Sequence, residues 1–484
     1  MSQTGIGTAT ASAPLWTGAA MAEAMDARPV HGLPEAVTGI SIDTRSLQPG
    51  DAFFAIAGDT RDGHQFASKA VAAGASCLVV QEGKLAALGR QTLPLLVVPD
   101  VLEALRMLGR AARARTKAKV VAVTGSAGKT TTKEALRHVL ERCGRVHASV
   151  KSYNNHWGVP LTLARMPADT EYAVFEIGMS HAGEITPLVR QVRPHIGMVT
   201  LIAAAHLGNF RNLDGIAHAK AEIFSGVVRG GTALINRDDK RFKLLAELAG
   251  KAGVNTIIGY GTSQRADAQL LNAKYLADCS CVTARVFGEE LAFKVGLPGR
   301  HVVHNMLGVL AVAHLVGADI TRVAHALADL PAPDGRGKRL TMKAGAGTFT
   351  LIDESYNANP ASVEAALDLV ATLVSGGHGR RIAVLGDMLE LGSHSRKLHE
   401  NLAAPVAKAG LDKLYLAGPE MAALAEKLGE APLEVIHHHS VDTLGEQLAE
   451  DVRADDVVMI KSSNGMGFSR LVSLFERADA PDAG

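Results

Sequence analysis

Residues 125–131 could bind the phosphates of a nucleotide. They read Gly-Ser-Ala-Gly-Lys-Thr-Thr, after the apolar stretch 119–124 and before a helical pattern, which is the context that a phosphate-binding loop requires. The usual pattern is G-x-x-x-x-G-K-[ST], but Val123 stands at the place of its first glycine and a glycine follows at Gly125. Backbone N–H groups at a helix N-terminus attract anions, so we interpret the loop as an ATP site, with an ordinary glycine-rich turn as the alternative. The loop residues predicted to bind ATP are Gly125, Ser126, Ala127, Gly128, Lys129, Thr130 and Thr131.

Two side chains of the loop and one acid could serve phosphate chemistry with Mg²⁺. In such loops the lysine, here Lys129, reaches the β- and γ-phosphates, and the following hydroxyl, here Thr130, reaches Mg²⁺. Glu176 ends the apolar stretch 172–176 in the same part of the chain. Mg²⁺ prefers oxygen ligands and usually shares them with substrate phosphates. Glu176 is therefore a candidate Mg²⁺ ligand, or else an acid exposed to solvent at the end of a strand.

His206 and Lys220 follow in a histidine- and lysine-containing segment. His206 comes after the apolar run 196–202, at the edge where such sheets bind ligands, although a single loop histidine is more often structural. Lys220 shares one helical face with apolar residues by the 3,4 spacing; these are Ile216, Ile223, Phe224 and Val227. Such a lysine either extends its ammonium to water or loses its proton when buried. A neutral amine could take up CO₂ to form a carbamate, an anionic metal ligand.

Two further segments could contact the rest of a nucleotide. His301 and Asn305 lie one helical turn apart in an apolar helix pattern and face the same way, so they could contact a base or ribose, or simply cap and pack the helix. Asp353 ends another apolar strand, and Asn359-Pro360 then precedes a helical pattern. This loop is either an N-cap or a nucleotide or hinge contact at the carboxyl end of a strand.

The elements that must position these residues alternate between strands and helices. The chain of 484 residues is long enough for about three domains at roughly 100–200 residues each. Apolar runs separated by helical patterns predict parallel strands with crossover helices. Segments with Pro and Gly separate three regions of the chain. We therefore predict an α/β fold of three domains: a small amino-terminal domain over 1–115, a central P-loop ATPase-like parallel-sheet domain over 116–329, and a Rossmann-like carboxyl-terminal domain over 330–484.

Composition excludes several classes of protein. A formal net charge of +1 argues against a general nucleic-acid binder. Four cysteines do not make a disulfide framework, and we interpret them as reduced thiols. No stretch approaches the roughly 20 apolar residues of a membrane span, and the amino terminus does not read as a signal peptide. We therefore expect a cytoplasmic protein without a membrane or nucleic-acid partner, a monomer, with its first residues partly disordered.

Four motifs together resemble the Mur ligases. They are TGSAGKTT (124–131), EIGMSHAGEI (176–185), KAEIF (220–224) and DESYNANP (353–360), and the resemblance runs from about Ile40 to the carboxyl end. In that family the first glycine of the loop stands where Gly125 does, so Val123 is no defect. The resemblance implies a domain for the UDP end of a substrate, a central ATPase-like domain and a Rossmann-like domain. It also implies an ATP-dependent amide ligase that works through an acyl phosphate in peptidoglycan precursor synthesis.

The resemblance also implies roles for individual residues. Thr130 and Glu176 would hold one Mg²⁺, His206 would be a ligand of a second metal, and Lys220 would be carbamylated. Asn305 would contact adenine, while Arg336 and Asp353 would reach the nucleotide from the carboxyl-terminal domain. The family positions that contact the UDP-linked substrate correspond here to Ser41, Thr44, Arg45, Asn154, Asn155 and His181.

The predicted substrates are UDP-N-acetylmuramoyl-tripeptide and D-Ala-D-Ala. The DNPR-type motif of the ligases that add diaminopimelate as the third residue is missing, and the YNANP form favours D-Ala-D-Ala. The stretch KSSNGMGF, with Lys461, Ser462 and Asn464, resembles the family's loop near the dipeptide. Alternatives are a third-residue-adding ligase of the same family, a folylpolyglutamate synthetase-like ligase, or, in another class, a regulatory protein that hydrolyses ATP. No guanine-binding N-K-x-D signature and no kinase signature occurs.

Overall fold

The computed structural model describes residues 14–479, except 59, 91, 374–378 and 430. The amino-terminal residues expected to be disordered thus lie largely outside the described ones. The described residues form two compact units. One contains the residues up to Ala118 together with Tyr153–Glu171, and the other contains Lys119–Ser152 together with the residues from Tyr172 on. The domain boundaries at 115/116 and 329/330 stay a prediction.

The first unit is built around a five-stranded sheet in the order β1-β5-β4-β3-β2. Its strands are β1 (Arg28–Val30), β2 (Gly39–Ser41), β3 (Asp51–Phe54), β4 (Cys77–Gln81) and β5 (Leu95–Val98). Strands β2 to β5 pair in parallel, and β1 pairs antiparallel to β5. The helices are α1 (Gly18–Met25), α2 (Ala67–Ala72), α3 (Val101–Arg115) and α5 (Gly158–Ala164). Helices α3 and α5 pack together, which places 153–171 in this unit.

The second unit holds the sheet that carries the phosphate-loop residues. Its order is β14-β13-β12-β11-β10-β9-β6-β8-β7. The parallel part comprises β6 (Lys119–Thr124), β7 (Val146–Ala148), β8 (Tyr172–Glu176), β9 (Ile196–Val199), β10 (Thr232–Asn236) and β11 (Thr256–Gly261). Strands β9 and β10 are buried along their whole length, as expected for parallel strands covered on both faces. The predicted strand–helix alternation is thus confirmed for this stretch.

An antiparallel extension widens this sheet. It consists of β12 (Ala268–Tyr275), β13 (Ser280–Val286) and β14 (Glu289–Val295), and β12 joins the rest by a short parallel pairing with β11. Burial alternates along β13, because only one face of the extension packs on the core. The expected parallel sheet is therefore a mixed one.

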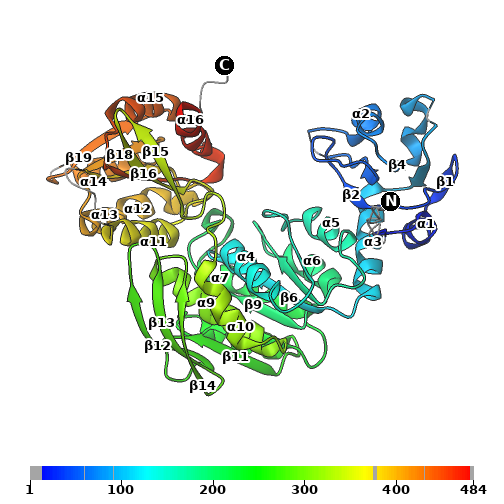
Figure 1. Ribbon diagram of the computed structural model, residues 1–484, viewed down its shortest axis with the longest axis horizontal. Helices are drawn as coiled ribbons and strands as arrows, with labels where there is room; N and C mark the ends of the chain where they lie inside the picture. Colours follow the sequence, from blue (N-terminus) through cyan, green and yellow to red (C-terminus); the bar gives the residue numbers. More distant parts are fainter. Residues whose placement is uncertain (1–13, 59, 91, 374–378, 430, 480–484) are drawn as a thin grey trace, which may run out of the picture. The chain divides into compact units, whose positions relative to one another are not determined.

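Helices cover the sheet on both sides. They are α4 (Lys129–Leu140), α6 (Ile185–Val192), α7 (Leu213–Ala221), α8 (Phe242–Lys251), α9 (Arg300–Leu315) and α10 (Ile320–Ala326). Helix α9 lies against α4 and strands β11, β12 and β13 (Figure 1). Its residues from Met306 to Ala313 are all buried, which accounts for the most apolar segment of the sequence. Along the described part of the chain, none of the helices combines the length and apolar character that a membrane crossing requires.

The last sheet has the order β15-β16-β20-β17-β18-β19. Its strands are β15 (Lys338–Ala344), β16 (Gly347–Glu354), β17 (Arg381–Gly386), β18 (Lys413–Ala417), β19 (Glu434–His438) and β20 (Val457–Lys461). All pair in parallel except β15, which forms a hairpin with β16. The helices are α11 (Pro360–Ala371), α12 (Ser395–Glu400), α13 (Ala403–Ala409), α14 (Ala422–Leu428), α15 (Val441–Asp451) and α16 (Ser469–Asp479). This arrangement matches the predicted Rossmann-like domain.

A charged network joins helix α15 to this last sheet. The carboxylate of Asp451 accepts hydrogen bonds from Tyr415 at 2.8 Å and Arg380 at 3.1 Å, and it pairs with Lys413 at 2.9 Å. Burial by itself would raise the pKa of Asp451, but the hydrogen bonds from Lys413, Tyr415 and Arg380 outweigh it and lower the pKa to about 2. A carboxylate with a lowered folded pKa stabilises the fold only where it is ionised.

Replacing Asp451 by asparagine should lower the free energy of unfolding at pH 7 by about 2 kcal/mol, since an unfolded aspartate has a pKa near 4. The contribution is present above the unfolded pKa and is lost as the pH falls through the folded one. The difference between the wild type and Asp451→Asn should therefore shrink from about pH 5 to about pH 2. Denaturant titrations at several pH values measure it, with the exposed Asp455→Asn as the control. A difference that does not change with pH would contradict this account.

Candidate active site

The phosphate-loop residues lie between β6 and α4, where Lys129 is the first helical residue. The loop is tied to the segment after β9: Ser126 N–H donates to Leu201 O at 2.7 Å, and the Thr200 hydroxyl donates to Ala127 O at 2.5 Å. Gly128 has φ +82°, and a Cβ there would lie 2.8 Å from the Asn305 amide nitrogen. Only glycine meets both conditions, because a side chain would be strained and would also collide. The loop therefore has the conformation and close packing of a nucleotide cradle.

Lys129 reaches back over this loop. Its Nζ donates to Gly125 O at 2.8 Å. Burial lowers the pKa of Lys129, with Glu176 opposing the shift and Arg336 adding to it. Arg336 lies just before strand β15 of the last sheet. A cation from a segment far away in the sequence therefore acts electrostatically on Lys129.

Thr130 and Glu176 form a pair of oxygen donors. The Thr130 hydroxyl donates to Glu176 Oε2 at 2.8 Å, and Glu176 is only 1% exposed. The alternative of a strand-end acid in solvent is therefore wrong. Mg²⁺ is usually held by one or two carboxylates together with substrate phosphates. A hydroxyl and a carboxylate beside a phosphate loop fit that ion, and both belong to the residues predicted to hold it.

Lys220 lies on α7 and is 1% exposed, so it does not extend to water. Helix α7 ends at Ala221, and a tighter 3₁₀ turn follows over Glu222–Gly226. The helical face predicted around Lys220 therefore does not continue as one α-helix. Among the described residues, no hydrogen bond or ion pair is formed by the ammonium of Lys220. Burial, together with the charge of Lys129, lowers the pKa of Lys220 far below its usual value. Both effects favour the neutral form of the amine.

His206 lies near both lysines and has a carboxylate partner. Its backbone is in the left-handed region, with φ +56°, and its Nδ1 contacts Glu390 Oε2 in the loop after β17. Burial lowers the pKa of His206; Glu390 opposes the shift, whereas Lys129 and Lys220 add to it. Glu390 was not predicted from the sequence. A histidine whose one nitrogen is held by a carboxylate presents its other nitrogen in a defined direction, as metal-binding histidines do.

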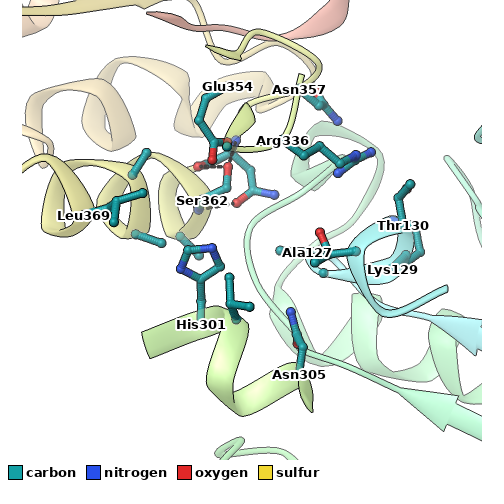
Figure 2. Close-up of a pocket in the computed structure, with 18 of the residues that line it drawn as sticks. Ala127, Lys129, Thr130, His301, Asn305, Arg336, Glu354, Asn357, Ser362 and Leu369 are labelled. Carbon is teal, nitrogen blue, oxygen red and sulfur yellow. Dashed lines mark hydrogen bonds between the residues drawn. The ribbon is translucent and has the colours of Figure 1, made fainter. Parts of the chain in front are cut away.

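A pocket in the second unit opens beside the loop (Figure 2). Figure 2 shows His301 and Asn305 pointing into it from α9, and Ala127, Lys129 and Thr130 facing them from the phosphate loop. Two of its walls are apolar: one is formed by α11, and the other by residues around the start of α9. The lining residues of the two apolar sides are Leu297, Pro298, Val302, Ala361, Ala365, Ala366 and Leu369. The small alanines leave room for a flat ring between two apolar walls, with polar groups at its edges, which is the usual composition of a cofactor site.

The remaining predicted nucleotide residues differ in position. Arg336 lines the pocket and lies over the Tyr356 ring at 4.3 Å. Asp353 does not line it: this buried carboxylate accepts from Gly335 N–H at 3.1 Å and Ser355 N–H at 3.0 Å. Asn359 caps α11 through Ser362 N–H at 3.0 Å and also donates to Ser126 O at 3.2 Å. The N-cap alternative for this loop therefore holds for Asn359, while the nucleotide or hinge contact stays a prediction.

Glu354 and Lys461 line the pocket as a buried ion pair that the sequence analysis did not connect. Lys461 Nζ lies 3.0 Å from Glu354 Oε2 and donates to Asn357 O at 3.0 Å. The two residues are register partners on the parallel strands β16 and β20. Each ends an apolar run, and this position at the carboxyl ends of neighbouring strands was the available signal.

The predicted substrate residues lie in two places. In the first unit, Arg45 is exposed and pairs with Asp43 at 2.6 Å. The Ser41 hydroxyl donates to Asp43 O at 3.0 Å. Thr44 lies between Asp43 and Arg45 in the sequence. Asn154 and Asn155 belong to the same unit, and Asn155 Oδ1 accepts from Gly158 N–H at 2.9 Å at the start of α5.

His181 belongs to the second unit. It is exposed in the loop between β8 and α6, where its Nδ1 lies 3.0 Å from Glu184 Oε1. Glu222 holds this loop by accepting from Gly183 N–H at 2.5 Å and from Thr186 N–H at 3.0 Å. The loop is therefore attached to the turn that directly follows Lys220.

Comparison with known proteins identifies the class. Residues 36–113 match the catalytic domain of the Mur ligase family, 123–313 the Mur ligase middle domain, and 338–464 the glutamate ligase domain of Mur ligases. A curated relative from Rickettsia prowazekii is 31% identical over 437 residues, which cover 90% of this chain and 95% of the relative. The chain belongs to the Mur ligase family.

Within that family the similarity is to one kind of enzyme. The Rickettsia relative is a UDP-N-acetylmuramoyl-tripeptide–D-alanyl-D-alanine ligase. The enzyme of the same name from Escherichia coli is 34% identical, over 83% of this chain and 85% of its own length. A crystal structure of MurF from Acinetobacter baumannii superposes with a TM-score of 0.81 at 27% identity, covering 96% of this chain and 99% of that one. The predicted three-domain α/β fold is confirmed by this likeness.

Filling the apolar wall of the pocket should block nucleotide binding. Ala365→Phe places a ring where α11 leaves space, so ADP should bind at least about ten-fold more weakly, a change of ~1.4 kcal/mol. Isothermal titration calorimetry measures the affinity. The control is Glu364→Phe, which puts the same side chain on the exposed neighbouring position of the helix. Equal affinities for the two variants would show that the base does not bind there.

Proposed function

We propose that this chain is an ATP-dependent ligase that joins D-Ala-D-Ala to the terminal carboxylate of UDP-N-acetylmuramoyl-tripeptide in peptidoglycan precursor synthesis. The observation that carries the proposal is the site of the second unit. There a phosphate loop, the Thr130–Glu176 oxygen pair and the buried Lys220, whose pKa is lowered, occur together in a chain of the Mur ligase family. The names of the similar enzymes support the choice of substrates.

The reaction takes two steps that conserve every atom. An oxygen of the substrate carboxylate attacks the γ-phosphorus of ATP, and ADP leaves, which yields an acyl phosphate. The neutral amine of D-Ala-D-Ala then attacks the acyl carbon; the tetrahedral intermediate expels phosphate, and the nitrogen loses a proton. Because two anions must approach each other, positive charge is needed between them. Lys129 and Arg336, which both line the nucleotide pocket, supply it.

Thr130 and Glu176 would hold Mg²⁺ with the phosphates of ATP. When bound, the ion neutralises phosphate charge and orients the γ-phosphoryl group. His206 would be a ligand of a second ion, and Glu390 would hold the imidazole in place. These assignments rest on the oxygen pair and on the ring nitrogen of His206 that faces away from Glu390.

Lys220 would act as a carbamate. Its amine is buried, and burial and the charge of Lys129 both lower its pKa. CO₂ addition would therefore place an anion where Lys129 disfavours a second cation. The nitrogen forms a bond to the carbon of CO₂ and loses a proton, which gives an anion with two oxygen donors. This change suits a site that must gather metal ions.

The other assignments complete the proposal. Asn305 would contact adenine, with Arg336 and Asp353 serving the nucleotide from the last domain, although Asp353 acts through the Gly335 turn that it holds. The UDP-linked substrate would be bound by Ser41, Thr44, Arg45, Asn154, Asn155 and His181. The protein would work as a monomer in the cytoplasm, where ATP and UDP-linked precursors are available.

An amine panel tests the reaction. With ATP, Mg²⁺ and UDP-N-acetylmuramoyl-tripeptide present, D-Ala-D-Ala should stimulate phosphate release, whereas a diamino acid and glutamate should not. Omitting the UDP-linked peptide should abolish release. Stimulation by a diamino acid or by glutamate would instead favour a third-residue-adding or a folylpolyglutamate synthetase-like ligase. ATP turnover without any acyl acceptor would favour a regulatory ATPase.

Lys220→Ala tests the carbamate. Loss of an indirect partner of a metal ligand costs about 10–100-fold, so loss of the ligand itself should lower the rate at least about 100-fold. Short carboxylic acids should restore part of the activity by filling the place of the carbamate. Lys251→Ala, which removes an exposed lysine, should leave the rate unchanged. Failure of every carboxylic acid to rescue Lys220→Ala would remove support for the carbamate.

A further inference from the structure

Lys133 is a fully buried cation one turn beyond the phosphate loop. It lies on α4, and its side chain is 0% exposed. Its Nζ donates to Ser149 O and to Lys151 O, each at 2.7 Å, and contacts the carboxylate of Glu134. An ammonium has three N–H donors, and all three thus have acceptors. Burying a charge is costly unless it is paired and hydrogen-bonded, so this geometry accounts for a lysine that points into the protein.

The two carbonyls belong to a turn that follows strand β7. At its centre Lys151 has φ +50°, a left-handed conformation that is uncommon for a residue with a side chain. The bonds from Lys133 to the carbonyls of Ser149 and Lys151 hold the turn on both sides of Val150. The conformation of the turn therefore depends on a side chain of the phosphate-loop helix.

The same turn carries two hydroxyls to the two residues proposed to hold Mg²⁺. Ser149 Oγ accepts from the backbone N–H of Glu176 at 3.3 Å. Ser152 Oγ lies 3.3 Å from the hydroxyl of Thr130. The backbone of Glu176 and the hydroxyl of Thr130 thus each have one neighbour on the turn that Lys133 holds.

We propose that Lys133 is a positioning residue of the Mg²⁺–ATP site. It acts through the 149–152 turn, which sets the place of Thr130 and Glu176 by the Ser152 and Ser149 hydroxyls. Groups that hydrogen-bond to metal ligands orient them and alter affinity for the ion. This inference rests on the proposed function, because it requires that the Thr130–Glu176 pair binds the metal of a metal–nucleotide complex. A purely structural Lys133 would instead affect only the stability of the fold.

Mn²⁺ in the presence of ADP separates these possibilities. Electron paramagnetic resonance titration gives the Mn²⁺ affinity without turnover. Lys133→Met should bind Mn²⁺ in the ADP complex about 10–100-fold more weakly. The control is Arg142→Met, which removes a cation just beyond the end of α4 whose ion pair with Asp329 is exposed. It should keep wild-type affinity.

A double-mutant cycle with Ser152→Ala tests the route. If Lys133 acts through the turn, the losses of Mn²⁺ affinity in Lys133→Met and Ser152→Ala should not add, because both variants interrupt one connection. Unchanged Mn²⁺ affinity in a destabilised Lys133→Met, or fully additive losses, would overturn the proposal. If Lys133→Met does not fold, Ser149→Ala and Ser152→Ala decide: wild-type affinity in both would overturn it. A wild-type protein whose Mn²⁺ binding is independent of ADP would instead contradict the proposed function.

Discussion

The site depends on positive charge held away from water. Lys129 lowers the pKa of both Lys220 and His206, and burial acts in the same direction on all three groups. Such a cluster is unfavourable without anions, because neither solvent nor described carboxylates compensate Lys220. ATP phosphates, a substrate carboxylate and a carbamate are the anions that would relieve it. The electrostatics of these residues thus favour anionic reactants.

The scaffold places these groups by the simple geometry of parallel sheets. Thr130 follows β6, Glu176 ends β8, and His206 follows β9, so three neighbouring strands deliver them to one edge. The segment after β9 is bonded to the phosphate loop through Ser126 and Thr200. Movement of one is therefore resisted by the other. Carboxyl ends of parallel strands are the usual place for ligands in such sheets, and the pocket of Figure 2 lies next to this edge.

Residues with a strong local signal were predictable. The apolar runs became β6, β8, β9 and β10, and the phosphate loop precedes α4 as expected. The extension β12–β14 was not predicted, since half-buried strands with alternating polarity carry a weaker pattern than buried parallel strands. Glu390 and Glu354 were missed for another reason. Each contacts a partner far away in the sequence, His206 in one case and Lys461 in the other, which local pattern does not indicate.

The sequence by itself determined which functional groups and motifs are present. They are a phosphate loop, an acid at a strand end, a lysine in an apolar face and the motifs of a ligase family. It left open whether Glu176 was in solvent and whether Lys220 reached water. Only the tertiary structure decided both, because burial depends on which distant segments cover a side chain. The same holds for Lys133, whose local pattern is that of an ordinary helix residue. Its acceptors lie 16 and 18 residues away and meet it only when β7 folds beside α4.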